Sequence, residues 1–144
     1  MTLNNKLFLF FISIILNILL ICLTRRFAME TGSLTLVYSK LYGWQILMNI
    51  CILVFLLIFL YEPIFSNINT VLLFSFIYAG GISNLIENLL YGSVLDYIPF
   101  TLLKGNPLFY FNLSDIYISV GVLTLIVFEG INQSMLNIDW HDDK

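Results

Sequence analysis

The sequence predicts an all-α integral membrane protein built as a bundle of four transmembrane helices. Composition is the first reason, because 60% of the 144 residues are hydrophobic and only 10% are charged, whereas a soluble domain carries about 25% charged residues. The second reason is the distribution of charge, which leaves four long apolar stretches. Since one crossing takes about 20 residues, four crossings use nearly all the apolar residues. We expect a single membrane domain over residues 1–144.

The apolar stretches locate the helices in order. Residues 7–24, 41–61 and 63–86 contain no charged side chain, and 116–128 is a fourth such run. Open strands leave backbone groups unpaired in lipid, and these runs lack the alternation of a barrel strand, so helices are expected. The predicted transmembrane helices cover approximately residues 7–23, 44–61, 69–90 and 113–130.

The first apolar stretch has two interpretations. A removable signal sequence would also place a cation, here Lys6, before an apolar run. However, no small-residue cleavage site follows the run, and Ile21 precedes Cys22 where a lipobox has a small residue. We therefore expect a retained membrane anchor.

A short polar connection joins the second and third helices. Pro63 ends the second, and Asn67 is among the residues that can cap the third. The resulting antiparallel hairpin places the first loop (24–43) and the third loop (91–112) together at the opposite membrane face. Four of the six cations lie in these two loops: Arg25, Arg26, Lys40 and Lys104. By the positive-inside rule, that face would be cytoplasmic.

One face of the third helix is polar. Gly80, Asn84, Glu87 and Asn88 recur at the spacing of a single helical face. A carboxylate inside a span costs about 3 kcal/mol and generally faces the bundle interior, a cavity or a partner. This face either packs helices closely, with Asn84 as a cross-helix hydrogen-bonding group, or forms part of a functional site.

Two aspartates follow this polar face. Asp96 lies just beyond the third helix, and Asp115 opens the fourth helix, three residues after the candidate N-cap Asn112. Taken singly, Asp96 can be a solvated loop acid, and Asp115 an acid that complements a helix N-terminus. Because both occupy the same membrane face, their carboxylates can converge near the end of the polar face.

The residues around the two aspartates carry a family resemblance. GGISNLIENLLYGSVLDYI at 80–98 is similar to a small-residue run leading into Asn-Leu-Ile-Asp-Arg and then Gly-x-Val-x-Asp-Phe-Ile. FNLSDIYISVG at 111–121 is similar to Phe-Asn-x-Ala-Asp. In order and spacing the chain resembles signal peptidase II, the lipoprotein signal peptidase of bacteria. The resemblance implies that Asp96 and Asp115 are catalytic. It implies supporting or substrate-binding roles for Asn84, Glu87, Asn88 and Asn112.

Other parts of the chain depart from the family pattern. The family motif Asn-x-Gly-Ala-Ala-Phe resembles Glu30-Thr31-Gly32-Ser33-Leu34, which makes Glu30 and Gly32 further candidates for substrate binding or site support. Glu87 and Asn88 stand where the family has Asp and Arg. The Asp and Lys of the family's first helix have no clear counterpart in this chain.

The resemblance implies an intramembrane aspartyl endopeptidase that cleaves lipidated prolipoproteins before the diacylglyceryl-cysteine. Two close carboxyl groups share one proton, so one can act as base on a water and the other as acid. The resemblance further implies a bacterial inner (cytoplasmic) membrane protein with its active site on the extracytoplasmic face, against the cation count. The expected partners are prolipoprotein substrates and membrane lipid, and we expect a monomer without a cofactor.

Two other functions fit parts of the sequence. A catalytically impaired pseudo-peptidase that binds precursors is favoured by the missing first-helix residues, and a small transporter or channel subunit could use the same carboxylates as an ion path. No metal site is expected, because the lone His141 lies in the tail at the other face. Nucleic-acid binding lacks a basic patch. Cys22 and Cys51 have no CxxC partner and are expected to pack as apolar residues.

Overall fold

The computed structural model describes residues 2–31, 35–39, 43–59, 67–102 and 105–139. Within these ranges the chain is mostly helical, and each predicted span coincides with a helix. The long helices are α1 (Leu3–Thr31), α2 (Gly43–Phe59), α4 (Ile68–Tyr91) and α5 (Leu113–Asp139). Of the described helices, α1 and α4 are long and apolar enough to cross a membrane, and the apolar parts of the others, 49–58 and 113–127, are shorter.

Two predicted helix ends are wrong. The first helix was expected to stop near residue 23 but continues to Thr31, and the fourth continues to Asp139 instead of ending near 130. The apolar run marks where lipid would cover a helix, whereas a helix stops at a breaker or a cap. Neither 24–31 nor 131–139 contains Pro or Gly. Arg25 and Arg26 therefore lie on α1 and not in a loop.

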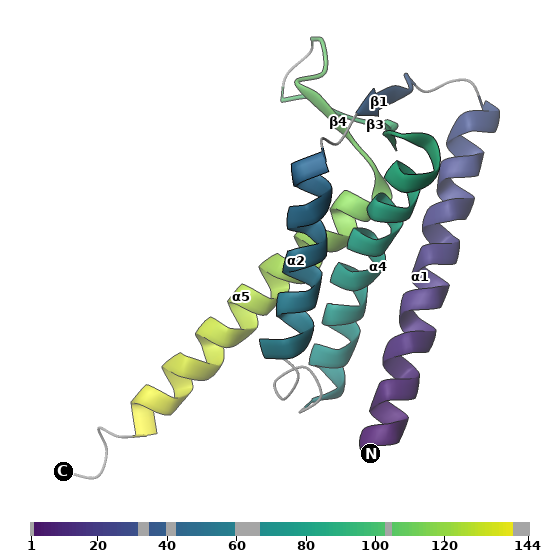
Figure 1. Cartoon of the computed structure of the whole chain (residues 1–144). Helices are drawn as coiled ribbons and strands as arrows, with labels where there is room; N and C mark the ends of the chain where they lie inside the picture. Colours follow the sequence, from purple (N-terminus) through teal and green to yellow (C-terminus); the bar gives the residue numbers. More distant parts are fainter. Residues whose placement is uncertain (1, 32–34, 40–42, 60–66, 103–104, 140–144) are drawn as a thin grey trace.

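The first and third loops contain short strands that the apolar pattern did not predict. In the first loop, β1 (Val37–Ser39) pairs antiparallel with β2 (Val94–Asp96) of the third loop, with Val37 opposite Asp96. Within the third loop, β3 (Ile98–Phe100) pairs with β4 (Phe109–Phe111). The strands lie at one end of the helices, and the start of α1 and the end of α5 lie at the other (Figure 1). The prediction that both loops share one end is thus confirmed.

Helix α4 is the centre of the bundle and packs mainly against α1 and α5. Phe10 and Ile14 of α1 join Val71, Phe74 and Tyr78 of α4 in a buried cluster. A hydroxyl pair, Ser13 Oγ with Ser75 Oγ at 2.7 Å, lies between the same two helices.

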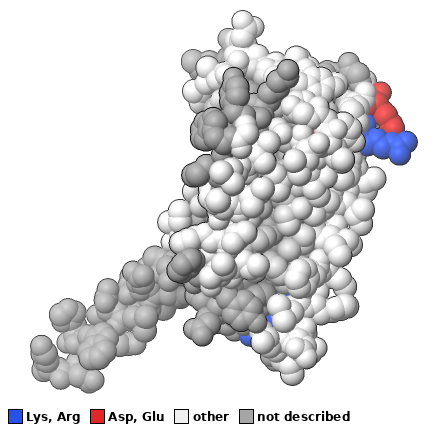
Figure 2. All heavy atoms as spheres, viewed as in Figure 1, with Lys and Arg blue, Asp and Glu red and all other residues white. Residues whose placement is uncertain are grey.

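The outer surface of the helices is apolar. On α1, Phe8, Leu16 and Leu23 are each more than half exposed. One face of the molecule shows charged side chains only near its two ends (Figure 2). Exposed apolar area of this extent is typical of a protein surrounded by lipid and not by water.

Glycines set the close approach of α4 and α5. A Cβ on Gly80 would lie 2.5 Å from the backbone oxygen of Ser114, and a Cβ on Gly121 would lie 2.6 Å from Ile77 Cγ1. Both distances are shorter than van der Waals contact allows. Since Ser114 precedes Asp115, the approach at Gly80 also sets the position of that carboxylate. The close packing expected of the small residues on α4 is confirmed at Gly80.

We expect the Gly80→Ala variant to be less stable, because the added methyl group overpacks a backbone contact, at a cost of about 1–3 kcal/mol. The measurement is the unfolding midpoint of the purified protein in detergent. Gly105→Ala is the matched control, since a Cβ at Gly105 meets no described atom within 4 Å. Equal midpoints for wild type and Gly80→Ala would contradict the close approach.

Candidate active site

Asn112 links the two aspartates directly. Its side-chain amide donates from Nδ2 to Asp96 Oδ1 at 2.9 Å, and its backbone N–H donates to Asp115 Oδ2 at 3.0 Å. The Asp115 N–H donates in return to Asn112 Oδ1 at 3.1 Å, which makes a reciprocal cap at the start of α5. Asn112 is only 3% exposed. The residue that caps the helix is therefore also the residue that links the two carboxyl groups.

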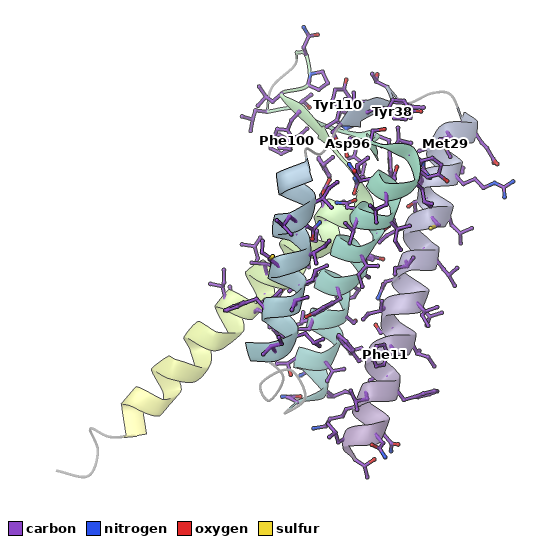
Figure 3. All side chains as sticks on the ribbon, in the orientation of Figure 1. Phe11, Met29, Tyr38, Asp96, Phe100 and Tyr110 are labelled. Atoms are coloured by element: carbon purple, nitrogen blue, oxygen red, sulfur yellow. The ribbon has the colours of Figure 1, made fainter. Side chains whose placement is uncertain are left out.

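Asp96 lies at the end of β2 and accepts a second hydrogen bond from the first loop. Ser39 Oγ on β1 lies 2.8 Å from Asp96 Oδ2. Burial raises the pKa of Asp96, and the negative charge of Asp115 raises it further, whereas the hydrogen bonds from Ser39 and Asn112 lower it. The net direction is upward. Figure 3 places Asp96 at the strand-bearing end, near Tyr38 and Tyr110 and far from Phe11.

Asn84 is the contact between α4 and Asp115. Its Nδ2 donates to Asp115 Oδ1 at 3.0 Å, so both oxygens of this carboxyl accept N–H bonds. The other polar atom of the amide, Asn84 Oδ1, is buried and has no hydrogen-bond partner among the residues described. A buried acceptor without a donor costs folding free energy.

Glu87 acts on the backbone beside Asp96. The carboxylate is 8% exposed, and its Oε1 accepts the N–H of Leu95, the residue before Asp96, at 2.9 Å. The same oxygen forms an ion pair with Arg25 Nε of α1 at 2.9 Å. The Arg25 guanidinium also lies 4.4 Å from the centroid of the Tyr91 ring. Glu87 thus holds strand β2 in place and ties α1 to the site.

Asn88 makes no hydrogen bond to Asp96 or Asp115 in the described structure. Asn88 is buried, but its Nδ2 has no hydrogen-bond partner in the described part of the chain. The backbone oxygen of Asn88 accepts the N–H of Gly92, whose positive φ of 70° ends α4.

The placement expected for Glu30 is wrong. It lies on the last turn of α1, is exposed, and pairs with Arg26 across the helix surface at 2.7 Å. The short motif match treated this segment as a loop, whereas the helix continues through it. Gly32 lies outside the described residues.

Sequence reasoning missed Ser39, the residue that reaches Asp96 from the first loop. Neither matched motif contains it. A weak signal was present, because Thr35, Val37 and Tyr38 form a short run of β-branched and aromatic residues that is typical of a strand.

A mainly apolar cavity of about 320 Å³ opens beside Asp115. Asp115 is the single charged residue among those that line it. The others are Phe100, Phe109, Phe111, Ile116, Ser119 and Val120. Within the described ranges, no three His, Cys, Asp or Glu side chains form a cluster able to hold a metal ion. The chemistry available is that of two linked carboxyl groups, one of which, Asp115, lines an apolar cavity.

Comparison with known proteins gives a consistent result. The family model for signal peptidase (SPase) II matches residues 5–130. The lipoprotein signal peptidase of Microcystis aeruginosa is 29% identical over 101 residues, which cover 70% of this chain and 63% of that protein. That of Bartonella henselae is 33% identical over 96 residues, covering 64% of this chain and 57% of that protein. The matches span less than two thirds of either relative's length.

Two solved structures, both described as bacterial membrane enzymes, are similar in fold. Their TM-scores are 0.56 and 0.57, with sequence identities of 18% and 19%. Each match covers 92% of this chain, together with 92% and 94% of the respective solved chains. At this identity the likeness concerns the fold.

The Arg25→Ala variant should lose about 2 kcal/mol or more of unfolding free energy, because it leaves the buried Glu87 carboxylate without its cation. Arg26→Ala is the matched control, and removal of its exposed pair should change stability by less than about 1 kcal/mol. Adding Glu87→Gln to Arg25→Ala should recover part of the loss, since Gln keeps an acceptor for the Leu95 N–H without a charge. Unfolding in detergent measures all three, and similar losses for both arginine variants would refute this pairing.

Proposed function

Because the chain belongs to the signal peptidase II family, we propose that it is a membrane-embedded aspartyl endopeptidase that cleaves signal peptides of lipidated prolipoproteins before the diacylglyceryl-cysteine. Asp96 and Asp115 are its catalytic pair. The observation that carries this proposal is the bridge through Asn112, whose amide donates to Asp96 Oδ1 at 2.9 Å while its N–H donates to Asp115 Oδ2 at 3.0 Å. One residue thereby fixes the relative position of two carboxyl groups.

The mechanism gives the two aspartates different protonation states. Two neighbouring carboxyl groups resist carrying two charges, so they share a proton. Burial and the charge of Asp115 raise the pKa of Asp96, which favours Asp96 as the member that holds the proton. Asp115 takes the role of base, and N–H bonds from Asn84 and Asn112 to its two oxygens hold it in position.

In the first step, Asp115 takes a proton from a water as the water oxygen attacks the scissile carbonyl carbon. Asp96 protonates the carbonyl oxygen in the same step, which gives a neutral tetrahedral intermediate. When the C–N bond breaks, Asp115 returns its proton to the departing amine nitrogen. Asp96 regains a proton from the intermediate's hydroxyl group, so the pair ends in its starting state.

The surroundings of Asp115 fit a substrate with apolar groups beside a peptide bond. The cavity at this carboxyl is walled mainly by aromatic and aliphatic side chains, which suit an apolar part of the precursor. The unpartnered Asn84 Oδ1 is buried in the free protein and would accept a backbone N–H of a bound peptide only if the packing around it opens. Peptide binding would then remove the cost of leaving this oxygen buried without a donor.

The membrane arrangement in this proposal has four crossings by one domain, residues 1–144, acting as a monomer in the bacterial cytoplasmic membrane. The strand-bearing end faces the extracytoplasmic side, where the lipid-anchored precursor meets the site. The pairing of β1 with β2 supports this arrangement, since it brings both long loops to one end. The cation count opposes this arrangement, because Arg25 and Arg26 lie on the end of α1 next to the strands and the positive-inside rule would place that end in the cytoplasm.

A cysteine introduced at Gly105 should react with a membrane-impermeant thiol reagent in intact cells, because the third loop faces outward in this arrangement. A cysteine at Thr2, at the opposite end of the bundle, should react only after permeabilisation. Both are introduced after Cys22 and Cys51 are replaced by Ser, and labelling is read by mass shift. The reverse pattern would place the site in the cytoplasm and contradict the arrangement.

Asp96→Asn and Asp115→Asn should each lower cleavage of a purified lipidated prolipoprotein by about 10²–10⁴-fold, the usual contribution of a general acid or base. The protein should remain folded, since Asn preserves shape and acceptor capacity on one oxygen. Glu30→Gln, on the outer surface of α1, should cleave like wild type. Precursor binding without cleavage by the wild-type protein would instead favour the pseudo-peptidase, and ion flux without proteolysis a transport role.

A further inference from the structure

The Ser39 hydroxyl has two oxygen neighbours, one on each side. Ser39 lies opposite Val94 in the pairing of β1 with β2. Its Oγ is 2.8 Å from Asp96 Oδ2 and 3.3 Å from the backbone oxygen of Val94. The neighbouring strand residue, Tyr38, marks this position beside Asp96 in Figure 3. The strand pairing brings the Ser39 hydroxyl within hydrogen-bonding distance of both other oxygen atoms.

A hydroxyl group carries one proton and two lone pairs, so it donates to one oxygen at a time. When Asp96 is ionised, the shorter and charge-assisted bond to Oδ2 is the favoured one. When Asp96 is protonated at Oδ2, two protons would meet if the hydroxyl still pointed there. The Val94 oxygen then offers the hydroxyl a second acceptor, which leaves a lone pair of Oγ facing the carboxyl proton.

We propose that Ser39 is a positioning residue for Asp96 that serves both of its protonation states. Its hydroxyl donates to Oδ2 of the ionised carboxylate and turns to the Val94 oxygen when Oδ2 carries a proton. Asn112 cannot play this role at the other carboxyl oxygen, because its Nδ2, which donates to Asp96 Oδ1, can only donate hydrogen bonds. The proton is therefore directed to Oδ2 and away from Oδ1.

This inference rests on the proposed function and adds a residue to its mechanism. Asp96 must give up a proton to the scissile carbonyl oxygen and later regain one. As the proton leaves Oδ2, the Ser39 hydroxyl swings from Val94 and stabilises the new carboxylate. The hydroxyl proton never leaves Ser39, so the balance of the reaction is unchanged.

Several charged or titratable groups belong to the elements around Asp96, and each must stay unchanged in a test of Ser39. Asp115 of α5 contributes a negative charge that disfavours ionised Asp96. Glu87 of α4 contributes another, with Arg25 paired to it. The remaining titratable side chains on the adjoining strands and on the end of α4 are Tyr38, Tyr91, Tyr97 and Tyr110. Substitutions confined to residue 39 leave all of these in place.

The test compares wild type, Ser39→Ala and Ser39→Thr as full chains in detergent, with a lipidated prolipoprotein as substrate. Ser39→Ala should lower kcat by about tenfold or more, the usual effect of losing a hydrogen bond to a charged group, with little change in KM. The pKa of Asp96, read from the pH profile of kcat, should rise by about 0.5–1 unit, because the ionised form of Asp96 loses a hydrogen-bond donor. Ser39→Thr keeps the hydroxyl and should restore both values.

Ser75→Ala is the matched control, because it removes a buried hydroxyl contact between α1 and α4 without touching the site. It should leave kcat and the pH profile as in wild type. A loss of kcat in Ser39→Ala with no pH shift, or a failure of Ser39→Thr to restore it, would reduce Ser39 to a packing residue and overturn the inference.

A measurement without turnover separates this inference from the proposed function. Infrared difference spectra can follow the carboxyl C=O band of Asp96 against pH, with Asp96→Asn used to identify the band. The band in Ser39→Ala should titrate at higher pH than in wild type and Ser39→Thr. Identical titrations overturn the role of Ser39 even if wild type cleaves the precursor. A shifted titration supports it even if wild type cleaves nothing, in which case the peptidase proposal fails alone.

Discussion

The hydrogen bonds of Asn112 determine most of what is particular to this site. The residue caps α5 through Asp115 and at the same time donates to Asp96, so the helix start and the carboxyl pair are one structure. Asn112 is only 3% exposed. A buried amide that loses a hydrogen bond cannot replace it with a bond to water, so breaking any of these bonds costs free energy. The close approach of α4 and α5 at Gly80 places α4 next to this cap. Asn84 of α4 can therefore donate a hydrogen bond to Asp115.

Charge burial is the second constraint, and it involves a helix far from the aspartates in sequence. Glu87 is almost fully buried, and a buried carboxylate is tolerated where a cation and hydrogen bonds compensate it. Arg25 provides the cation and the Leu95 N–H provides the hydrogen bond. The family pattern has a cation next to this acid on the same helix, at the position of Asn88. In this chain the cation comes from α1, which makes the first helix part of the site's support.

The sequence allowed the helices and the two central acids to be predicted, for different physical reasons. Long apolar runs identify segments that lipid can cover, and the residues around Asp96 and Asp115 match the family pattern in order and spacing. The strands escaped prediction because three-residue strands carry almost no periodic signal. Ser39 escaped prediction because its partner lies 57 residues away in sequence. Glu30 was misplaced because a five-residue match ignored the continuing helix.

Two polar atoms on α4, Asn84 Oδ1 and Asn88 Nδ2, are buried without a partner in the described structure, and they lie one helical turn apart on the same face. A protein normally satisfies such groups, because each costs about 1–3 kcal/mol when left unpaired. One atom is an acceptor and the other a donor, which is the pairing that an extended peptide backbone offers with its own N–H and C=O groups. Both atoms are closed off in the free protein, so a bound peptide can pair with them only if the packing around α4 opens. In the proposed peptidase, the cost of these two groups in the free protein would then become binding energy in the complex.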